Sequence, residues 1–162
     1  MQPEARAARY AEARAAIGSL LDGEDDFIAA LATVASELHH TFDYFDFTGF
    51  YRLVRPDVLV IGPYQGRHGC LRIDVARGVC GAAVRERRTQ LVPDVDAFPG
   101  HIACVSTTRS ELVVPLIAPS GRVLGVLDVD SNTPSAFTEL DARELEAVAA
   151  DLGRRFDDAA PL

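Results

Sequence analysis

The hydrophobic period of this 162-residue chain changes sharply near residue 45, and that change limits the folds it can adopt. Between residues 26 and 42, apolar side chains recur every three or four positions, which is the spacing of one buried helix face. From residue 46 the chain becomes aromatic and β-branched, and the turn sequence Arg55-Pro56-Asp57 separates two such runs. Helical segments followed by β-hairpins favour an α+β fold.

The rest of the chain extends this pattern. We expect an N-terminal helix within residues 1–22, because the segment is rich in Ala, Arg and Glu, and a C-terminal helix over residues 138–157, where a capping sequence precedes an apolar stripe. Between residues 62 and 69, Gly and Pro predict irregular backbone, and residues 93–108 predict a long connection. A short helix is expected at 78–87, and further strands at 70–73, 90–92, 111–117 and 123–130. Residues 1–162 are therefore expected to form a single domain, an antiparallel sheet with helices at both chain ends.

Charge and hydropathy exclude two classes of partner. The chain has 16 Lys and Arg against 24 Asp and Glu, and a net charge of −8 would repel a nucleic-acid backbone. The first ten residues lack the apolar stretch of a secretion signal, and no later segment approaches the ~20 apolar residues that a membrane helix needs. We therefore expect a cytoplasmic protein that binds neither nucleic acid nor membranes.

Three cysteines, Cys70, Cys80 and Cys104, are the chemically distinctive residues. In a reducing compartment an odd number argues against a structural disulfide framework and leaves packing, metal binding or catalysis. Structural zinc sites pair cysteines two to four residues apart, whereas these lie at least ten positions apart, so neither they nor His68 and His101 predict such a site. Cys80 falls in the first turn of the short predicted helix, where the helix dipole favours a thiolate, and is a redox candidate.

Acidic residues accompany the cysteines. Asp128 and Asp130 alternate along one strand, so both carboxylates project from the same face roughly 6.6 Å apart. Glu111 begins the partner strand; a four-residue connection would place it opposite Asp130, and a three-residue connection would not. The sequence leaves this register open. Such carboxylates favour either proton sharing or a bound cation.

Several motifs resemble those of the free methionine-(R)-sulfoxide reductases, which are single GAF domains. The resemblance covers nearly the whole chain in order and includes the cysteine spacing. The matching segments are Gly49-Phe50-Tyr51, Gly62-Pro63-Tyr64-Gln65-Gly66, Cys70-Leu71-Arg72-Ile73, Gly78-Val79-Cys80-Gly81, residues 96–104, residues 110–116 and residues 125–131. This resemblance implies a GAF fold, with the N- and C-terminal helices on one face of a central antiparallel sheet and with ligand-covering loops and a short helix on the other.

The resemblance also implies an activity, the reduction of free L-methionine (R)-S-oxide to methionine. Cys104 matches the nucleophile, Cys70 its favoured resolving partner, and Cys80 a third cysteine that exchanges disulfides. Glu111, Asp128 and Asp130 match carboxylates that hold substrate and assist protonation, and Phe47 and Tyr51 would form an aromatic wall. The implied enzyme needs no cofactor or metal and is recycled by an external thiol such as thioredoxin. Its terminal helices offer surfaces that GAF domains often use to form homodimers, although the sequence leaves the oligomeric state open.

Two positions depart from the family pattern. Phe47 stands where the family usually has Trp, which predicts a looser fit around the substrate methyl group, and Val105 stands where an Asp often follows the nucleophile. A competing interpretation is a noncatalytic GAF module that binds a small molecule and signals through its terminal helices. That interpretation accounts for the fold but not for three cysteines at these positions.

Overall fold

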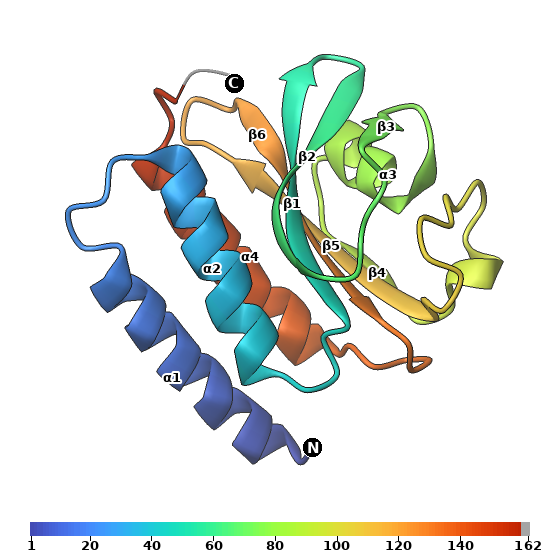
Figure 1. Cartoon of the computed structure of the whole chain (residues 1–162), viewed down its shortest axis with the longest axis horizontal. Helices are drawn as coiled ribbons and strands as arrows, with labels where there is room; N and C mark the ends of the chain where they lie inside the picture. Colours follow the sequence, from blue (N-terminus) through green and yellow to red (C-terminus); the bar gives the residue numbers. More distant parts are fainter. Residues whose placement is uncertain (160–162) are drawn as a thin grey trace.

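The computed structural model describes residues 1–159 and contains one six-stranded sheet with the strand order β3-β2-β1-β6-β5-β4 (Figure 1). All neighbouring strands are antiparallel. The helices and the 3-10 turn are α1 (Pro3–Leu20), α2 (Phe27–Thr41), α3 (Gly78–Glu86), η1 (Val95–Ala97) and α4 (Glu139–Arg155). The strands are β1 (Phe47–Arg55), β2 (Val58–Gly66), β3 (Arg72–Asp74), β4 (Gln90–Val92), β5 (Ser110–Ile117) and β6 (Val123–Ser131). The expected α+β class and antiparallel sheet are confirmed.

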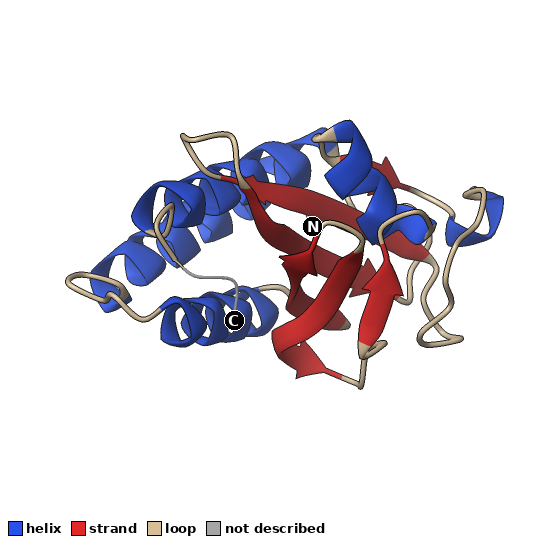
Figure 2. Ribbon diagram, turned by 90° about the horizontal axis from the view of Figure 1, so that it is seen from above, coloured by secondary structure: helices blue, strands red, loops and turns tan. Residues whose placement is uncertain are grey.

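The two faces of the sheet are covered differently. Helices α2 and α4 pack directly on one face, and α1 lies outside them as a further layer that contacts both (Figures 1 and 2). The apolar stripe of α2, which includes Leu31, Val34 and Leu38, is fully buried in this core. Helix α3 and the long connections cover the other face, where a second, smaller core surrounds Cys80. A site on that second face is therefore walled by α3 and by loops.

One sequence-based expectation was wrong. The chain from Gly62 to Gly66 is not irregular, because β2 continues through it and pairs with β1 as far as Gly66. The register shifts between the pairs Gly49–Tyr64 and Tyr51–Ile61, so that two residues of β2, one of them Pro63, oppose a single residue of β1. Such a β-bulge accommodates a proline, which has no N–H to give to a sheet ladder.

A buried carboxylate ties α1 to α4. Asp141 is fully buried and accepts hydrogen bonds from the Tyr10 and Tyr44 hydroxyls at 2.8 and 2.6 Å. It also forms an ion pair with Arg6 and completes the capping box at Thr138. Because every partner of this charge would be left unsatisfied if it were removed, the cluster is expected to contribute strongly to stability.

We therefore expect Asp141→Asn to lower the free energy of unfolding by about 3 kcal/mol, measured by urea denaturation. Asp151→Asn is the matched control, because Asp151 lies on the same helix and pairs with Arg154 and Arg155 at the surface, where ion pairs contribute less than about 1 kcal/mol. Equal losses in the two variants would contradict the role assigned to Asp141.

No helix among residues 1–159 is both long enough and apolar enough to cross a bilayer.

Candidate active site

A disulfide bond joins Cys70 to Cys104, with Cα atoms 5.2 Å apart across 34 positions of sequence. Cys70 lies between β2 and β3, and Cys104 lies in the connection between η1 and β5. Both residues are partly exposed, so an external thiol has a route to the bond. The remaining cysteine, Cys80, is a free thiol buried on α3.

One pocket collects most of the residues that the sequence singled out. It lies between the sheet, α3 and the connection that carries Cys104, and its volume is about 30 Å³. The lining includes Phe47, Tyr51, Cys80, Cys104, Glu111, Asp128 and Asp130. Cys70 is absent from this lining and reaches it through its bond to Cys104. By this measure the pocket in the disulfide state has room for a few atoms, the size of one or two water molecules.

The three carboxylates of this pocket meet because of the β5–β6 register. Glu111 pairs with Asp130, and Val113 pairs with Asp128, so the register that the sequence left open is the one that sets Glu111 opposite Asp130. Glu111 and Asp128 are only 6% and 5% exposed. The long run of buried apolar residues in both strands fixes this pairing, since a slip of one residue would turn the apolar side chains to the other face.

Burial makes these carboxylates weak acids. Burial, strengthened by the nearby charge of Asp130, raises the pKa of Glu111 to about 7. Burial also raises the pKa of Asp128, with Glu111 as the second cause, and the pKa of Asp130, with Asp128 as the second cause. The pocket can therefore hold at least one protonated carboxyl near neutral pH, unless a cation enters.

Two polar neighbours of the carboxylates were not assigned a role from the sequence. His101 Nε2 lies 3.4 Å from Glu111 Oε2, and this contact raises the pKa of His101. The Thr108 hydroxyl donates a hydrogen bond of 3.5 Å to Asp130 Oδ2. Both residues belong to the connection between η1 and β5, which also carries Cys104. The unusual length of this connection was the signal in the sequence that could have indicated a functional role for them.

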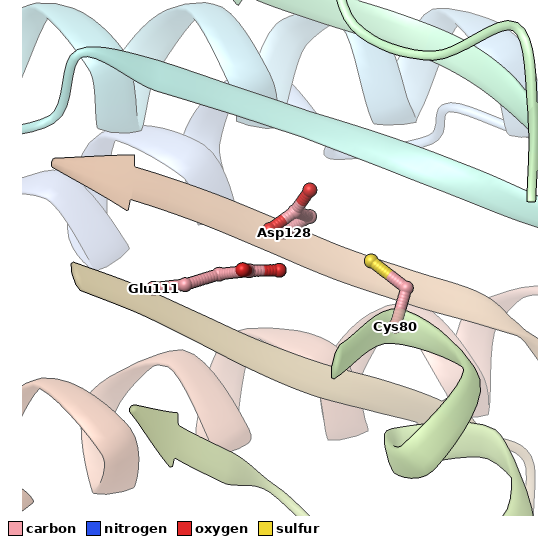
Figure 3. A group of neighbouring side chains, drawn as sticks. All are labelled: Cys80, Glu111 and Asp128. Atoms are coloured by element: carbon pink, nitrogen blue, oxygen red, sulfur yellow. The ribbon is translucent and has the colours of Figure 1, made fainter. Parts of the chain in front are cut away.

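The expectation that Cys80 favours a thiolate was wrong. Cys80 does lie in the first turn of α3, but burial, followed by the charge of Asp128, raises the pKa of its thiol. Desolvation and neighbouring carboxylates outweigh a helix dipole that stabilises an anion by at most ~2 kcal/mol. In the absence of a cation Cys80 is a neutral thiol, and its Sγ lies within 4.8 Å of carboxylate oxygens of Glu111 and Asp128 (Figure 3).

Aromatic rings form another wall of the pocket. Phe47 and Tyr51 both lie on β1, and Phe47 stacks on Tyr64 of β2 with ring centroids 5.5 Å apart. Gly69 lies against this wall: a Cβ atom at that position would come within 2.6 Å of the Tyr51 hydroxyl. The pocket thus combines a disulfide-bonded cysteine, a buried acid and an apolar wall, an arrangement that suits the reduction of a small polar group on an apolar side chain.

Comparisons with known proteins agree with this geometry. The GAF domain family model matches residues 24–157. The chain is 41% identical to a free methionine-R-sulfoxide reductase of Escherichia coli over 143 residues, which is 88% of this chain and 86% of the relative. A second relative with that name, from Saccharomyces cerevisiae, is 38% identical over 80% of this chain and 76% of its own length.

A solved structure extends the similarity to three dimensions. The free methionine-R-sulfoxide reductase of Neisseria meningitidis, in complex with its substrate, superposes with a TM-score of 0.89 at 45% identity and covers 94% of this chain and 90% of the relative. The family model, both relatives and this structure agree, and the chain belongs to the free methionine-R-sulfoxide reductase family of GAF-domain proteins.

Proposed function

We propose that this protein reduces free L-methionine (R)-S-oxide to L-methionine with a cysteine thiolate. The observation that carries the proposal is the position of Cys104, which is disulfide-bonded to Cys70 and lines the same pocket as three buried carboxylates. Relatives at 41% and 38% identity carry the name of this activity, and two similar solved structures are described as substrate complexes.

In the first step, the Cys104 thiolate attacks the sulfoxide sulfur and Glu111 donates its proton to the sulfoxide oxygen. Attack forms a bond between the two sulfur atoms and a hydroxyl group on the substrate sulfur. The hydroxyl group then passes to Cys104 Sγ as the sulfur–sulfur bond and the substrate sulfur–oxygen bond break, so methionine leaves, Cys104 becomes a sulfenic acid and Glu111 becomes an anion. A pKa of about 7 suits Glu111 to this task, because a general acid works best when its pKa lies near the working pH.

In the second step, the Cys70 thiol condenses with this sulfenic acid, and a disulfide and a water molecule form. The Cα separation of 5.2 Å is within the normal range for a disulfide, so Cys70 serves as the resolving cysteine. An external dithiol, for which we propose thioredoxin, then reduces the bond, so the cycle requires no bound cofactor. In this cycle the disulfide is reduced before the next substrate molecule reacts, because Cys104 must be a free thiol to attack the sulfoxide.

The substrate ammonium group is placed against Asp128 and Asp130. Three carboxylates near Cys104 would otherwise raise the pKa of its thiol and suppress the thiolate. A bound ammonium group cancels part of that negative charge, so the nucleophile becomes reactive once the free amino acid is present. Phe47 and Tyr51 are placed around the apolar end of the substrate.

This arrangement predicts selectivity for the free amino acid. We expect N-acetyl-methionine sulfoxide to be reduced with a kcat/KM about 5- to 150-fold below that of the free compound, because an uncharged amide leaves buried carboxylates uncompensated at a cost of ~1–3 kcal/mol. Methionine and N-acetylmethionine release, measured by chromatography at equal substrate concentrations, tests this. Comparable turnover of the two compounds would contradict the placement of the ammonium group.

The activity itself is tested with the separated R and S epimers of free methionine sulfoxide and dithiothreitol. Methionine release from the R epimer alone is expected. The competing proposal, a noncatalytic GAF module, predicts no release from either epimer.

We also propose that residues 1–162 act as one domain and that the protein is located in the cytoplasm. We propose in addition that surfaces of the terminal helices support a homodimer, which light scattering would detect.

A further inference from the structure

The Cys80 thiol has no part in the proposed cycle of Cys104 and Cys70, yet it faces the carboxylates of Glu111 and Asp128 in the pocket. Cys80 is 3% exposed and comes from α3, whereas Glu111 comes from β5 and Asp128 from β6. Figure 3 shows these three side chains converging from the three elements, and one donor atom of each lies within 4.8 Å of the other two. In the disulfide state Cys80 is the free thiol that remains.

A second observation indicates that this cluster is built to receive a cation. Asp128 is 5% exposed, and its Oδ1 has no hydrogen-bond partner among the described residues. The polar groups that interact with the Asp128 carboxyl are Cys80 and Glu111, the other two members of the cluster. A buried carboxylate oxygen without a partner is costly, and such oxygens are usually paired with a cation or hydrogen-bonded. In the proposed cycle the substrate ammonium group satisfies this need, but the pocket of the disulfide state, with a volume of about 30 Å³, has room for a small occupant such as a single ion.

The donor set identifies the kind of cation. One sulfur and two carboxylate oxygens suit zinc, which accepts thiolate and carboxylate ligands together, and they do not suit magnesium, which requires oxygen ligands. Ligand atoms around a tetrahedral zinc ion lie roughly 3.4 to 3.6 Å apart, so side-chain rotations that close the present spacing by less than about 1.5 Å would complete the site. His101 Nε2 lies 3.4 Å from Glu111 Oε2 but is not one of the donors that lie within 4.8 Å of one another, so a water molecule would take the fourth position.

We propose that Cys80, Glu111 and Asp128 form a zinc-binding site inside the substrate pocket, and that zinc there excludes the substrate. The ion would occupy the two carboxylates that the proposed mechanism assigns to proton donation and to the ammonium group. Zinc would therefore act as an inhibitor of the enzyme and not as its cofactor. The inhibitory effect rests on the proposed function, whereas the binding site does not.

Zinc binding at this site must release protons. Zinc binds a cysteine as its thiolate, so forming the zinc–sulfur bond breaks the S–H bond of Cys80 and releases one proton to solvent. A carboxyl group that is protonated in the free pocket releases its proton as well. Titrations in buffers of different ionisation enthalpy would count the protons released.

The binding test uses the full chain in its disulfide form, so that Cys80 is the thiol available to a metal. Cobalt(II) serves as a spectroscopic substitute for zinc, and we expect a sulfur-to-cobalt charge-transfer absorption that zinc abolishes and magnesium does not. Cys80→Ser is expected to remove this absorption and to weaken zinc binding at least about tenfold in equilibrium dialysis. The matched control is His40→Gln, which removes an exposed potential ligand on α2 and should leave both measurements unchanged.

Equal zinc affinity in the native protein and in Cys80→Ser would overturn the site, as would the absence of the charge-transfer absorption. Asp128→Asn gives an independent check, because it preserves the thiol and the side-chain shape yet should also weaken zinc binding at least about tenfold. Thermal unfolding of each variant without metal shows whether its fold is retained.

Inhibition is tested on prereduced protein from which the reductant has been removed. Zinc added before free methionine (R)-sulfoxide is expected to lower the single-turnover rate at least tenfold, and a chelator is expected to restore it. Full turnover with zinc bound through Cys80 would overturn the exclusion of substrate. A protein that binds zinc through Cys80 but never reduces the sulfoxide would instead disprove the proposed function while leaving the zinc site in place.

Discussion

Replacement of Cys104 by serine is expected to abolish the release of methionine from free methionine (R)-sulfoxide. Serine preserves the size of the side chain but cannot supply the thiolate that attacks sulfur, so turnover should fall at least about a thousandfold. The measurement is steady-state methionine release with excess dithiothreitol. Normal turnover by Cys104→Ser would contradict the assignment of the nucleophile.

Cys70→Ser is the informative companion, because it removes the resolving thiol and leaves the nucleophile intact. Without an external thiol we expect this variant to form one methionine per protein molecule and then stop, with Cys104 left as a sulfenic acid. If Cys70→Ser instead turned over repeatedly without added thiol, or formed no methionine in the first turnover, the order of events proposed for the two cysteines would be wrong.

The second large effect is expected for Glu111→Gln, which keeps the shape of the side chain and removes its acidic proton. Loss of a general acid typically lowers kcat by about 10² to 10⁴. The pH dependence of the rate tests whether Glu111 is the acid. Glu111 must be protonated to act, so the rate is high below its pKa of about 7 and falls as the pH rises through that value. In Glu111→Gln this descending limb of kcat/KM should be absent.

Glu144→Gln is the matched control for this variant, because Glu144 pairs with Arg14 between α4 and α1, outside the pocket. We expect it to keep both the rate and the pH profile of the native protein. A descending limb near pH 7 that persists in Glu111→Gln would show that another group donates the proton, and Asp128 would be the next residue to test.

The elements of the fold could be predicted largely from local patterns. Apolar residues recur at helical spacing in α2, where they include Leu31 and Val34, and form continuous runs in β5 and β6. Such patterns predict which residues are buried, and burial is the property that a sequence indicates most directly. The strand from Gly62 to Gly66 was missed, because a β-bulge is specified by pairing with a neighbouring strand and not by the residues of the bulged segment alone.

The site was only partly predictable, because its chemistry depends on contacts between distant segments. The alternation of Asp128 and Asp130 placed both carboxylates on one face, but the position of Glu111 required the pairing register. Local reasoning also misjudged Cys80, since a helix terminus is visible in the sequence whereas the buried carboxylates facing it are not. The pairing of Cys70 with Cys104 came from family resemblance and not from spacing.

The most direct test of the account is to locate the oxidised sulfur after a single reduction. Prereduced Cys70→Ser would receive one equivalent of free methionine (R)-sulfoxide and then a reagent that labels sulfenic acids, and the labelled peptide would be identified by mass spectrometry. The account predicts one label per methionine formed, on Cys104. Methionine formation accompanied by a label on Cys80, or by no label on any cysteine, would contradict it.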